Sequence, residues 1–297
     1  MKTLNQLIGL ASDKSKFRLI NDYINFCREY LMFASVGLQA VIVSRNEQHY
    51  QFFQYKQDGN YNISRPINSN VMVAPEHFDS MTSSFVYALA NIQDIESQAD
   101  RECINRVVYT CQQAIGATLD ALLAGRSNTA RKINGDLFEK FIQLILTEIG
   151  VDVHSGTVPV PVIVDDVRLF DMFYQQDLII KKDKELLAVG SVKTSSKDRL
   201  AKIFIDKFLH NRLTGVDTPH FAVFLNDVQR KGREPNYKVN ATFLTGHFKG
   251  YTIKLNPLDG VYYCDIRPNM RSDNILKEHI KTLDCLFVDD IWKFLEQ

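Results

Sequence analysis

The spacing of apolar residues divides the chain into a first part dominated by helices and a second part in which strands and helices alternate. In the first part, helical spacing covers Lys16–Leu31, Phe78–Ile95 and Ala99–Leu123. Two strand-like runs, Leu38–Val43 and His49–Gln57, lie between the first two helices. The pattern therefore predicts a mainly helical N-terminal region, residues 1–125, that forms a core or a subunit interface.

The second part begins after a soft boundary at residue 125, where Gly125 is a plausible helix stop. A third strong helix, Leu137–Ile149, is followed by predicted strands and one more helix. These strands are Val158–Val164, Val167–Phe173, Asp177–Ile180, Leu186–Lys193 and His220–Leu225, with a helix at Lys197–Arg212 before the last. The order is typical of an α/β (α+β) fold in which helices flank a mixed sheet, and it assigns residues 126–297 to one domain.

The end of the chain adds two further predictions. Apolar and polar residues alternate from Tyr237 to Ile266 in the manner of antiparallel strands. Two short helices, Ile275–Leu283 and Val288–Leu295, are expected to close the chain.

The charges of the chain balance overall and are uneven only locally. The 297 residues include 35 basic and 35 acidic ones, so the formal net charge is zero. Between Lys181 and Lys207, basic residues outnumber acidic ones by about four, which favours a polyanion at that segment. A solvated charged face would give the same count.

Cysteine usage and hydropathy bear on location. The five cysteines form no CxxC pair and have no zinc-finger spacing, which fits reduced thiols in a cytoplasm. Residues 1–14 lack the apolar core of a signal peptide, and no apolar run approaches the roughly 18 residues of a membrane span. We expect a cytoplasmic protein without membrane contact.

Candidate chemistry lies on two neighbouring predicted strands. Asp177 opens one strand and Lys193 ends the next, and a separation of 16 positions suits an antiparallel pair. Hydrolysis of a phosphodiester needs a metal ion, an activated water and stabilisation of developing charge. Asp177 and the Val192 carbonyl are candidate Mg²⁺ ligands, because Mg²⁺ takes oxygen ligands and keeps several waters. Lys193 is the candidate for positioning the water.

A second carboxylate is missing from the strand itself, where Ser191 stands two residues before Lys193. Asp206, on the following predicted helix, is the candidate replacement; the alternative is a helical i,i+4 pair with Lys202. Glu139 lies beside an apolar helix stripe and is a further candidate, although an exposed glutamate in a first helical turn is equally ordinary. Asp171 is the main rival to Asp177.

The run Lys197-Asp198-Arg199 has donors and an acceptor suited to bases. Lys and Arg donate to guanine in the major groove, and Asp accepts from cytosine, so these residues could contact adjacent G·C pairs. Ser195 or Ser196 would cap the helix that begins there. The alternative is that Asp198 only complements the helix dipole while Lys197 is solvated.

Together these residues resemble the PD-(D/E)xK nuclease superfamily, and more narrowly the type II restriction endonucleases whose second acid has moved to the following helix. The resemblance covers roughly Lys132–Leu225. The matching elements are Asp177, Ser191-Val192-Lys193, Lys197-Asp198-Arg199 and Asp206, together with Gly135 and Glu139 upstream. Two positions depart from the family pattern, since Gln176 stands where proline is frequent and Asp206 where several relatives have glutamate.

The resemblance implies a restriction-endonuclease-like fold and a Mg²⁺-dependent type II enzyme of a restriction–modification system. Residues 126–297 would be its catalytic domain, and residues 1–125 would supply dimer contacts, DNA contacts or both. It implies catalytic roles for Asp177, Lys193, Asp206 and Glu139, metal contacts through Asp177, Asp206 and Val192, and cleavage of double-stranded DNA at sites containing CC and GG. A homodimer is expected, and a tetramer is possible in this family. Three alternatives remain open: a structure-specific repair or junction nuclease, a DNA-binding module without activity, and a protein-interaction module.

Overall fold

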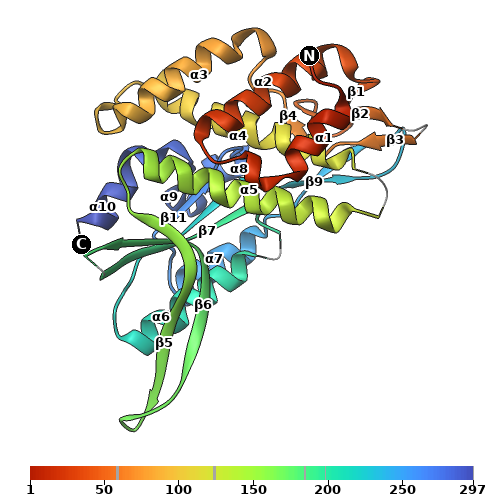
Figure 1. The fold of residues 1–297 in the computed structure, drawn as a ribbon. Coiled ribbons are helices and arrows are strands. Elements are labelled where there is room, and N and C mark those ends of the chain that lie inside the picture. The colour runs from red at the N-terminus through yellow and green to blue at the C-terminus, as the bar shows by residue number, and fades with distance from the viewer. Residues whose placement is uncertain (58–59, 123–124, 184, 198, 297) are drawn as a thin grey trace. The chain divides into compact units, whose positions relative to one another are not determined.

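The computed structural model describes residues 1–57, 60–122, 125–183, 185–197 and 199–296. It separates into two compact units (Figure 1). The first unit comprises Met1–Leu144 and Val228–Thr242, and the second comprises Ile145–Asp227 and Phe243–Gln297. This division differs from the expected one at residue 125, because the first unit extends into a long helix and also takes in a later hairpin.

Three helices of the first unit follow the predicted apolar stripes, another begins ten residues before its predicted start at Leu137, and the first helix was not predicted. The helices are α1 (Leu4–Ser12), α2 (Ile20–Gly37), α3 (Pro75–Ala90), α4 (Gln98–Asp120) and α5 (Ser127–Glu148), with short 3₁₀ turns η1 (Lys14–Lys16) and η2 (Ile92–Asp94). Helix α4 is buried on all sides from Cys103 to Leu119, apart from Arg106. A helix enclosed in this way is the centre of its unit.

A small antiparallel sheet completes the first unit. Its strands are β1 (Ala40–Val43), β2 (Tyr50–Gln57), β3 (Asn60–Ile63) and β4 (Ile67–Asn68), and both β3 and β4 pair with β2. The later hairpin consists of β9 (Val228–Lys231) and β10 (Lys238–Ala241). Its apolar side chains Val228, Tyr237 and Val239 form one cluster with Tyr50 and Phe52 of β2, so the hairpin is part of this core.

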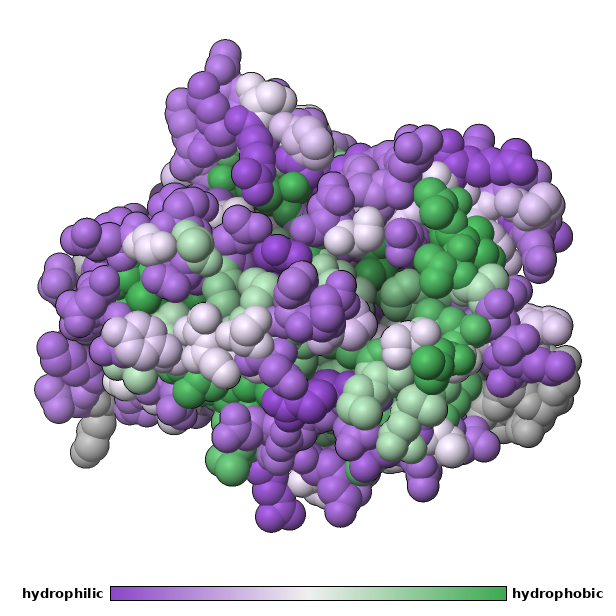
Figure 2. All heavy atoms as spheres, turned by 90° about the horizontal axis from the view of Figure 1, so that it is seen from above, coloured by the Kyte–Doolittle hydropathy of each residue, from purple (hydrophilic) through white to green (hydrophobic). Residues whose placement is uncertain are grey.

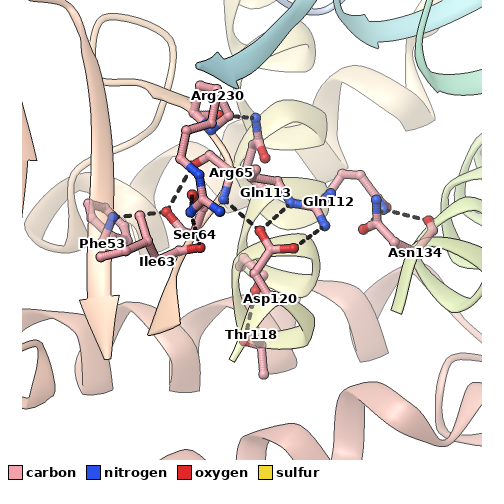
Figure 3. Close-up of polar contacts among 12 residues, drawn as sticks. Phe53, Ile63, Ser64, Arg65, Gln112, Gln113, Thr118, Asp120, Asn134 and Arg230 are labelled. Carbon is pink, nitrogen blue, oxygen red and sulfur yellow. Dashed lines mark hydrogen bonds and ion pairs between the residues drawn. The ribbon is translucent and has the colours of Figure 1, made fainter. Parts of the chain in front are cut away.

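Polar contacts anchor the loop after β3 to helix α4 (Figure 3). Arg65 donates from its backbone N–H, Nε and Nη2 to the carboxylate of Asp120, at 2.6 to 2.9 Å. The guanidinium lies where a side chain at Gly116 would otherwise be, 2.4 Å from the position of a Cβ atom there. Arg230 of β9 donates to the carbonyls of Ile63 and Ser64 at 2.6 and 3.2 Å, which ties the hairpin to the same loop.

The second unit is built on a six-stranded mixed sheet in the order β12-β11-β8-β7-β6-β5. Strands β5, β6 and β7 are antiparallel, whereas β7, β8, β11 and β12 run parallel. Their bounds are β5 (Val153–Val164), β6 (Val167–Lys182), β7 (Glu185–Ser195), β8 (His220–Asn226), β11 (Gly260–Tyr263) and β12 (Ile280–Thr282). The helices are α6 (Leu200–Thr214), α7 (Thr245–Lys254), α8 (Pro268–Ser272), α9 (Leu276–His279), the π-helical turn η3 (Leu286–Asp290) and α10 (Ile291–Leu295). The predicted fold class, a mixed sheet flanked by helices, is confirmed.

The prediction for Tyr237–Ile266 is wrong in its central part. Helix α7 occupies Thr245–Lys254, and β11 pairs in parallel with β8. Phe248 and Thr252 are buried at helical spacing, and the Phe248 ring packs against Phe204 of α6 at 5.6 Å. Burial of that one face, set by contacts distant in sequence, outweighs the local alternation.

Two boundaries also differ from the predictions. Strand β6 is one continuous strand, whereas separate strands were expected at Val167–Phe173 and Asp177–Ile180. The helix expected at Ile275–Leu283 ends at His279, and β12 follows it.

The surface of the molecule is consistent with a sequence that has no long apolar run. The face in Figure 2 is largely hydrophilic, with apolar side chains reaching the surface in several places. Among the residues described, no helix has the length and apolar character needed to cross a membrane.

Candidate functional site

Asp177 and Lys193 meet on neighbouring strands of the second unit. Leu178 of β6 is level with Gly190 of β7, so Asp177 lies beside the stretch of β7 that ends in Lys193. The Lys193 ammonium forms an ion pair and hydrogen bond with Asp177 Oδ2. The backbone N–H of Val192 donates to the same oxygen at 2.8 Å. The structure thus brings together three residues that the sequence placed in one site.

The pair is half-buried and rests on apolar neighbours. The Asp177 side chain is 15% exposed and that of Lys193 29%. Leu178, Val192 and Phe224 are fully buried, and Lys193 is level with Phe224 of the parallel strand β8. The apolar anchors fix both strands, so the two charged groups are held at the surface of a rigid sheet.

A β-bulge in β6 coincides with this site. Between paired positions, β5 advances two residues from His154 to Gly156, whereas β6 advances three from Gln176 to Ile179. The extra residue falls in the segment that contains Asp177. Bulges re-aim side chains and occur often beside active sites. The expectation that Asp177 begins its strand is wrong, because it lies in the second half of β6, at the bulge.

Asp206 lies on α6 and pairs with Lys202 on the same helix. This is the i,i+4 contact considered as the alternative to a metal role. Its side chain is 16% exposed, compared with 66% for Lys202. Burial and the nearby Asp206 charge raise the pKa of the Tyr174 phenol on β6, so Asp206 faces the sheet near that residue.

Glu139 belongs to the first unit and is half-buried in the middle of α5. The helix begins at Ser127, so the alternative of a first-turn glutamate favoured by the helix dipole is wrong. Within the described part of the chain, no three His, Cys, Asp or Glu side chains gather closely enough to hold a metal ion.

The expected base-contacting residues stand at the start of α6. Lys197 and Arg199 are exposed, and Asp198 lies outside the described residues. Arg199 occupies the N-cap position without a side-chain cap, and Ser195 Oγ accepts the N–H of Lys197 at 3.2 Å in the preceding turn. The predicted serine cap of the helix is therefore wrong.

Asp171, the rival to Asp177, has a different partner. Its carboxylate accepts from Arg168 Nε at 3.0 Å on the same strand. This local pair occupies both side chains near the end of the β5–β6 hairpin.

Sequence reasoning missed a buried histidine pair in the same unit. His210 of α6 and His220 of β8 are 4% and 2% exposed, and their ring centroids are 5.3 Å apart. Burial lowers the pKa of both, that of His220 to about 3. No spacing pattern marks them, because the pair forms only when α6 packs on the sheet.

The architecture of a mixed sheet flanked by helices is similar to that of a solved restriction endonuclease. The crystal structure of the type IIP restriction endonuclease Kpn2I matches with a TM-score of 0.74 and 18% identity, over 99% of this chain and 97% of that one. This similarity establishes the fold.

Two more distant structures also match. The restriction endonuclease PspGI in complex with substrate DNA has a TM-score of 0.43 at 13% identity, over 73% of this chain and 90% of that chain. The AgeI–DNA complex has a TM-score of 0.37 at 11% identity, over 73% and 87%. No protein-family model and no curated protein matches the chain.

Proposed function

We propose that this protein is a Mg²⁺-dependent type II restriction endonuclease that hydrolyses double-stranded DNA at a specific site, one containing CC and GG. The observation that carries the proposal is the Asp177–Lys193 pair on adjacent strands, within a fold similar to Kpn2I over nearly its whole length. An acid and an ammonium held together at the surface of a rigid sheet suit the hydrolysis of a phosphodiester.

The residues present are compatible with Mg²⁺. This ion is commonly held by one or two carboxylates while it keeps several waters, so a dense acidic cluster is not required. Lys193 and Val192 both donate to Oδ2 of Asp177, and a carboxylate has a second acceptor oxygen. Asp177 and the Val192 carbonyl would hold the ion, with Asp206 as a further contact. The role of Glu139, on α5 of the first unit, stays a prediction.

The bound ion would polarise the phosphate and lower the pKa of a water. Lys193 would orient that water and donate to a phosphate oxygen as negative charge develops. Asp177 keeps the ammonium in place, and its β-strand setting limits movement of both groups. For Asp206 to take part, its carboxylate would have to exchange Lys202 for the metal.

Recognition is assigned to Lys197, Asp198 and Arg199, which would contact G·C pairs in the major groove. The exposure of Lys197 and Arg199 is compatible with that role. Because a palindromic site is two-fold symmetric, a homodimer is the simplest assembly, with a tetramer as the larger form. Membership of a restriction–modification system and a cytoplasmic location complete the proposal.

The test is incubation of the protein with plasmid DNA and Mg²⁺, followed by sequencing of the fragment ends. Cleavage at one short sequence is expected. Lys193→Ala should reduce cleavage by about 100- to 1,000-fold, as removal of a transition-state donor does, while DNA binding is retained. Lys254→Ala, on an exposed position of α7, is the matched control and should cut normally.

Three results would contradict the proposal. Full cutting by Lys193→Ala would remove the assigned site. Cuts set by branches or ends and not by sequence would identify a junction nuclease, and tight binding without Mg²⁺-stimulated breaks would identify a DNA-binding module.

A further inference from the structure

The hairpin β9–β10 turns one of its faces toward the core of the first unit. Side chains alternate between the two faces along each strand, and the pairs Val228–Ala241 and Arg230–Val239 share this inner face. Val228 and Val239 are buried in the apolar cluster that includes β2. Arg230 donates to two carbonyls at the end of β3 (Figure 3). The inner face therefore attaches the hairpin to its unit.

The outward edge of β10 is attached as well. Asn46, between β1 and β2, accepts the N–H of Val239 through Oδ1 and donates to its carbonyl through Nδ2, both at 2.9 Å. The N–H of Arg45 donates to the carbonyl of Tyr237 at 3.0 Å. These bonds take up backbone groups that an added strand would need. The hairpin is thus held as a rigid ribbon, and a ligand would have to approach its other face.

The opposite face of the ribbon is basic and exposed. It carries the cross-strand pairs Lys231–Lys238 and Gln229–Asn240, and Arg233 follows in the connection between the strands. These five residues are called the outer surface below. All of them except Gln229, which is half-buried, are exposed. The hairpin segment has four basic residues and one acidic residue, so it is locally positive in a chain of zero net charge.

The positive charges of the outer surface are not balanced by the protein. Lys231 and Lys238 lie directly opposite each other, which places their Cβ atoms roughly 5 Å apart, and like charges in that position destabilise a sheet. Within the part of the chain that the structure describes, neither lysine nor Arg233 forms an ion pair. A ligand with several negative charges would relieve this repulsion.

Double-stranded DNA fits this surface in charge and in shape. DNA carries one negative charge per roughly 1.7 Å of its axis, and lysine, arginine and the carboxamides of Asn and Gln all donate to phosphate oxygens. A two-stranded ribbon also matches the width of the major groove. An acidic protein would instead need carboxylates placed to match each basic group. The choice of DNA over such a protein rests on the proposed function.

We propose that the outer surface binds the phosphate backbone of double-stranded DNA without selecting its sequence. Lys231 and Lys238 each neutralise a phosphate, and Arg233 extends the contact beyond the ladder. Contacts of this kind position a protein on the duplex but carry no sequence information. The hairpin would thereby add affinity, while the choice of site stays with the proposed base contacts at the start of α6.

The experiment is fluorescence anisotropy of the full-length protein on two unrelated mixed-sequence DNA duplexes, without divalent metal and over a series of salt concentrations. Lys231→Gln/Lys238→Gln should weaken binding at least about 10-fold at low salt on both duplexes, because each phosphate contact releases counterions. The slope of log affinity against log salt should become shallower by about two, one for each lysine. The melting temperature of this variant should equal or exceed that of the wild type, since repulsion between the lysines is removed.

Two matched variants separate a local contact from an effect of total charge. Lys231→Arg/Lys238→Arg keeps both positive charges and should bind like the wild type. Lys254→Gln/Lys277→Gln removes two positive charges from exposed positions of α7 and α9 and should leave the salt slope unchanged. In plasmid cleavage, Lys231→Gln/Lys238→Gln should give the same fragment ends as the wild type at a higher protein concentration.

Three outcomes would overturn the outer surface as a phosphate contact. The first is a wild-type salt slope in Lys231→Gln/Lys238→Gln, and the second is an equal loss in Lys254→Gln/Lys277→Gln. The third is a change of fragment ends, which would assign base reading to the hairpin. Specific cleavage with an unchanged slope contradicts only this inference. The expected loss of binding in a protein that never cuts DNA contradicts only the nuclease.

Discussion

Two aspartate–cation pairs, one in each unit, use their carboxylates differently. Asp120 accepts three donors of Arg65 with both of its oxygens (Figure 3). Asp177 receives Lys193 and the Val192 N–H on the single oxygen Oδ2. A carboxylate saturated by a planar guanidinium fixes a loop to a helix, whereas one held on one oxygen by an ammonium keeps capacity for a further ligand.

Replacing Asp177 tests the functional side of the comparison with the largest expected effect. Asp177→Asn removes the negative charge proposed to anchor Mg²⁺ while keeping the side-chain size. Single-turnover cleavage should slow by at least about 1,000-fold, equivalent to about 4 kcal/mol. Urea denaturation should show a smaller loss of unfolding free energy than Asp120→Asn does, because the Lys193 ammonium is 29% exposed and can be hydrated. Cleavage at the normal rate would show that Asp177 is not in the active site.

Replacing Asp120 tests the structural side. Asp120→Asn leaves the guanidinium of Arg65 without its counter-charge in a mostly buried place, and the unfolding free energy should fall by about 3 kcal/mol. Asp79→Asn is the control, because Asp79 pairs with Arg28 but is 75% exposed. That change should cost less than about 0.5 kcal/mol. Equal losses for the two variants would remove the distinction between the buried and exposed pairs.

The pH dependence of the unfolding free energy should reveal the contribution of His220 in the second unit. The folded state holds the pKa of His220 at about 3 through burial, below the unfolded value of about 6.5. Stability is therefore complete above pH 6.5 and falls toward pH 3 as the unfolded chain takes up the proton, by about 1.4 kcal/mol per pH unit. His220→Gln should flatten this dependence in denaturant titrations, and His77→Gln, on an exposed position of α3, should not. An unchanged slope in His220→Gln would refute the assignment.

Lys202→Ala has the smallest expected effect on stability. The Lys202 side chain is 66% exposed, so its pair with Asp206 contributes about 0.5 kcal/mol or less. Release of Asp206 should lower the Mg²⁺ concentration for half-maximal cleavage by a few-fold if this carboxylate joins the metal site. Lys277→Ala on α9 is the control. An unchanged Mg²⁺ dependence would keep Asp206 outside the site.

Sequence reasoning performed well where the determinants are local. Strand periodicity and a separation of 16 residues placed Asp177 and Lys193 on adjacent antiparallel strands, and the structure shows their contact. Three helices of the first unit follow from their apolar stripes. The catalytic role of Asp177 and Lys193 stays a prediction.

Features that depend on contacts between residues far apart in the sequence could not be predicted from it. The bulge at Asp177 is defined only by pairing with β5. Helix α7 contains Gly246, Gly250 and the β-branched Ile253, which are weak helix formers, and it is stabilised by packing on α6. Pairing of His210 with His220 needs the helix docked on its sheet.

The hairpin β9–β10 has a consequence for modularity. Since Val228–Thr242 folds with the first unit although it is encoded inside the second, neither unit corresponds to one uninterrupted piece of polypeptide. A truncation after residue 144 would remove Val228, Tyr237 and Val239, and Tyr50 and Phe52 of β2 would lose these apolar neighbours. A gene fragment for the first unit alone must therefore include these fifteen residues, and one for the second unit must omit them. Natural exchange of the N-terminal half between relatives would be constrained in the same way.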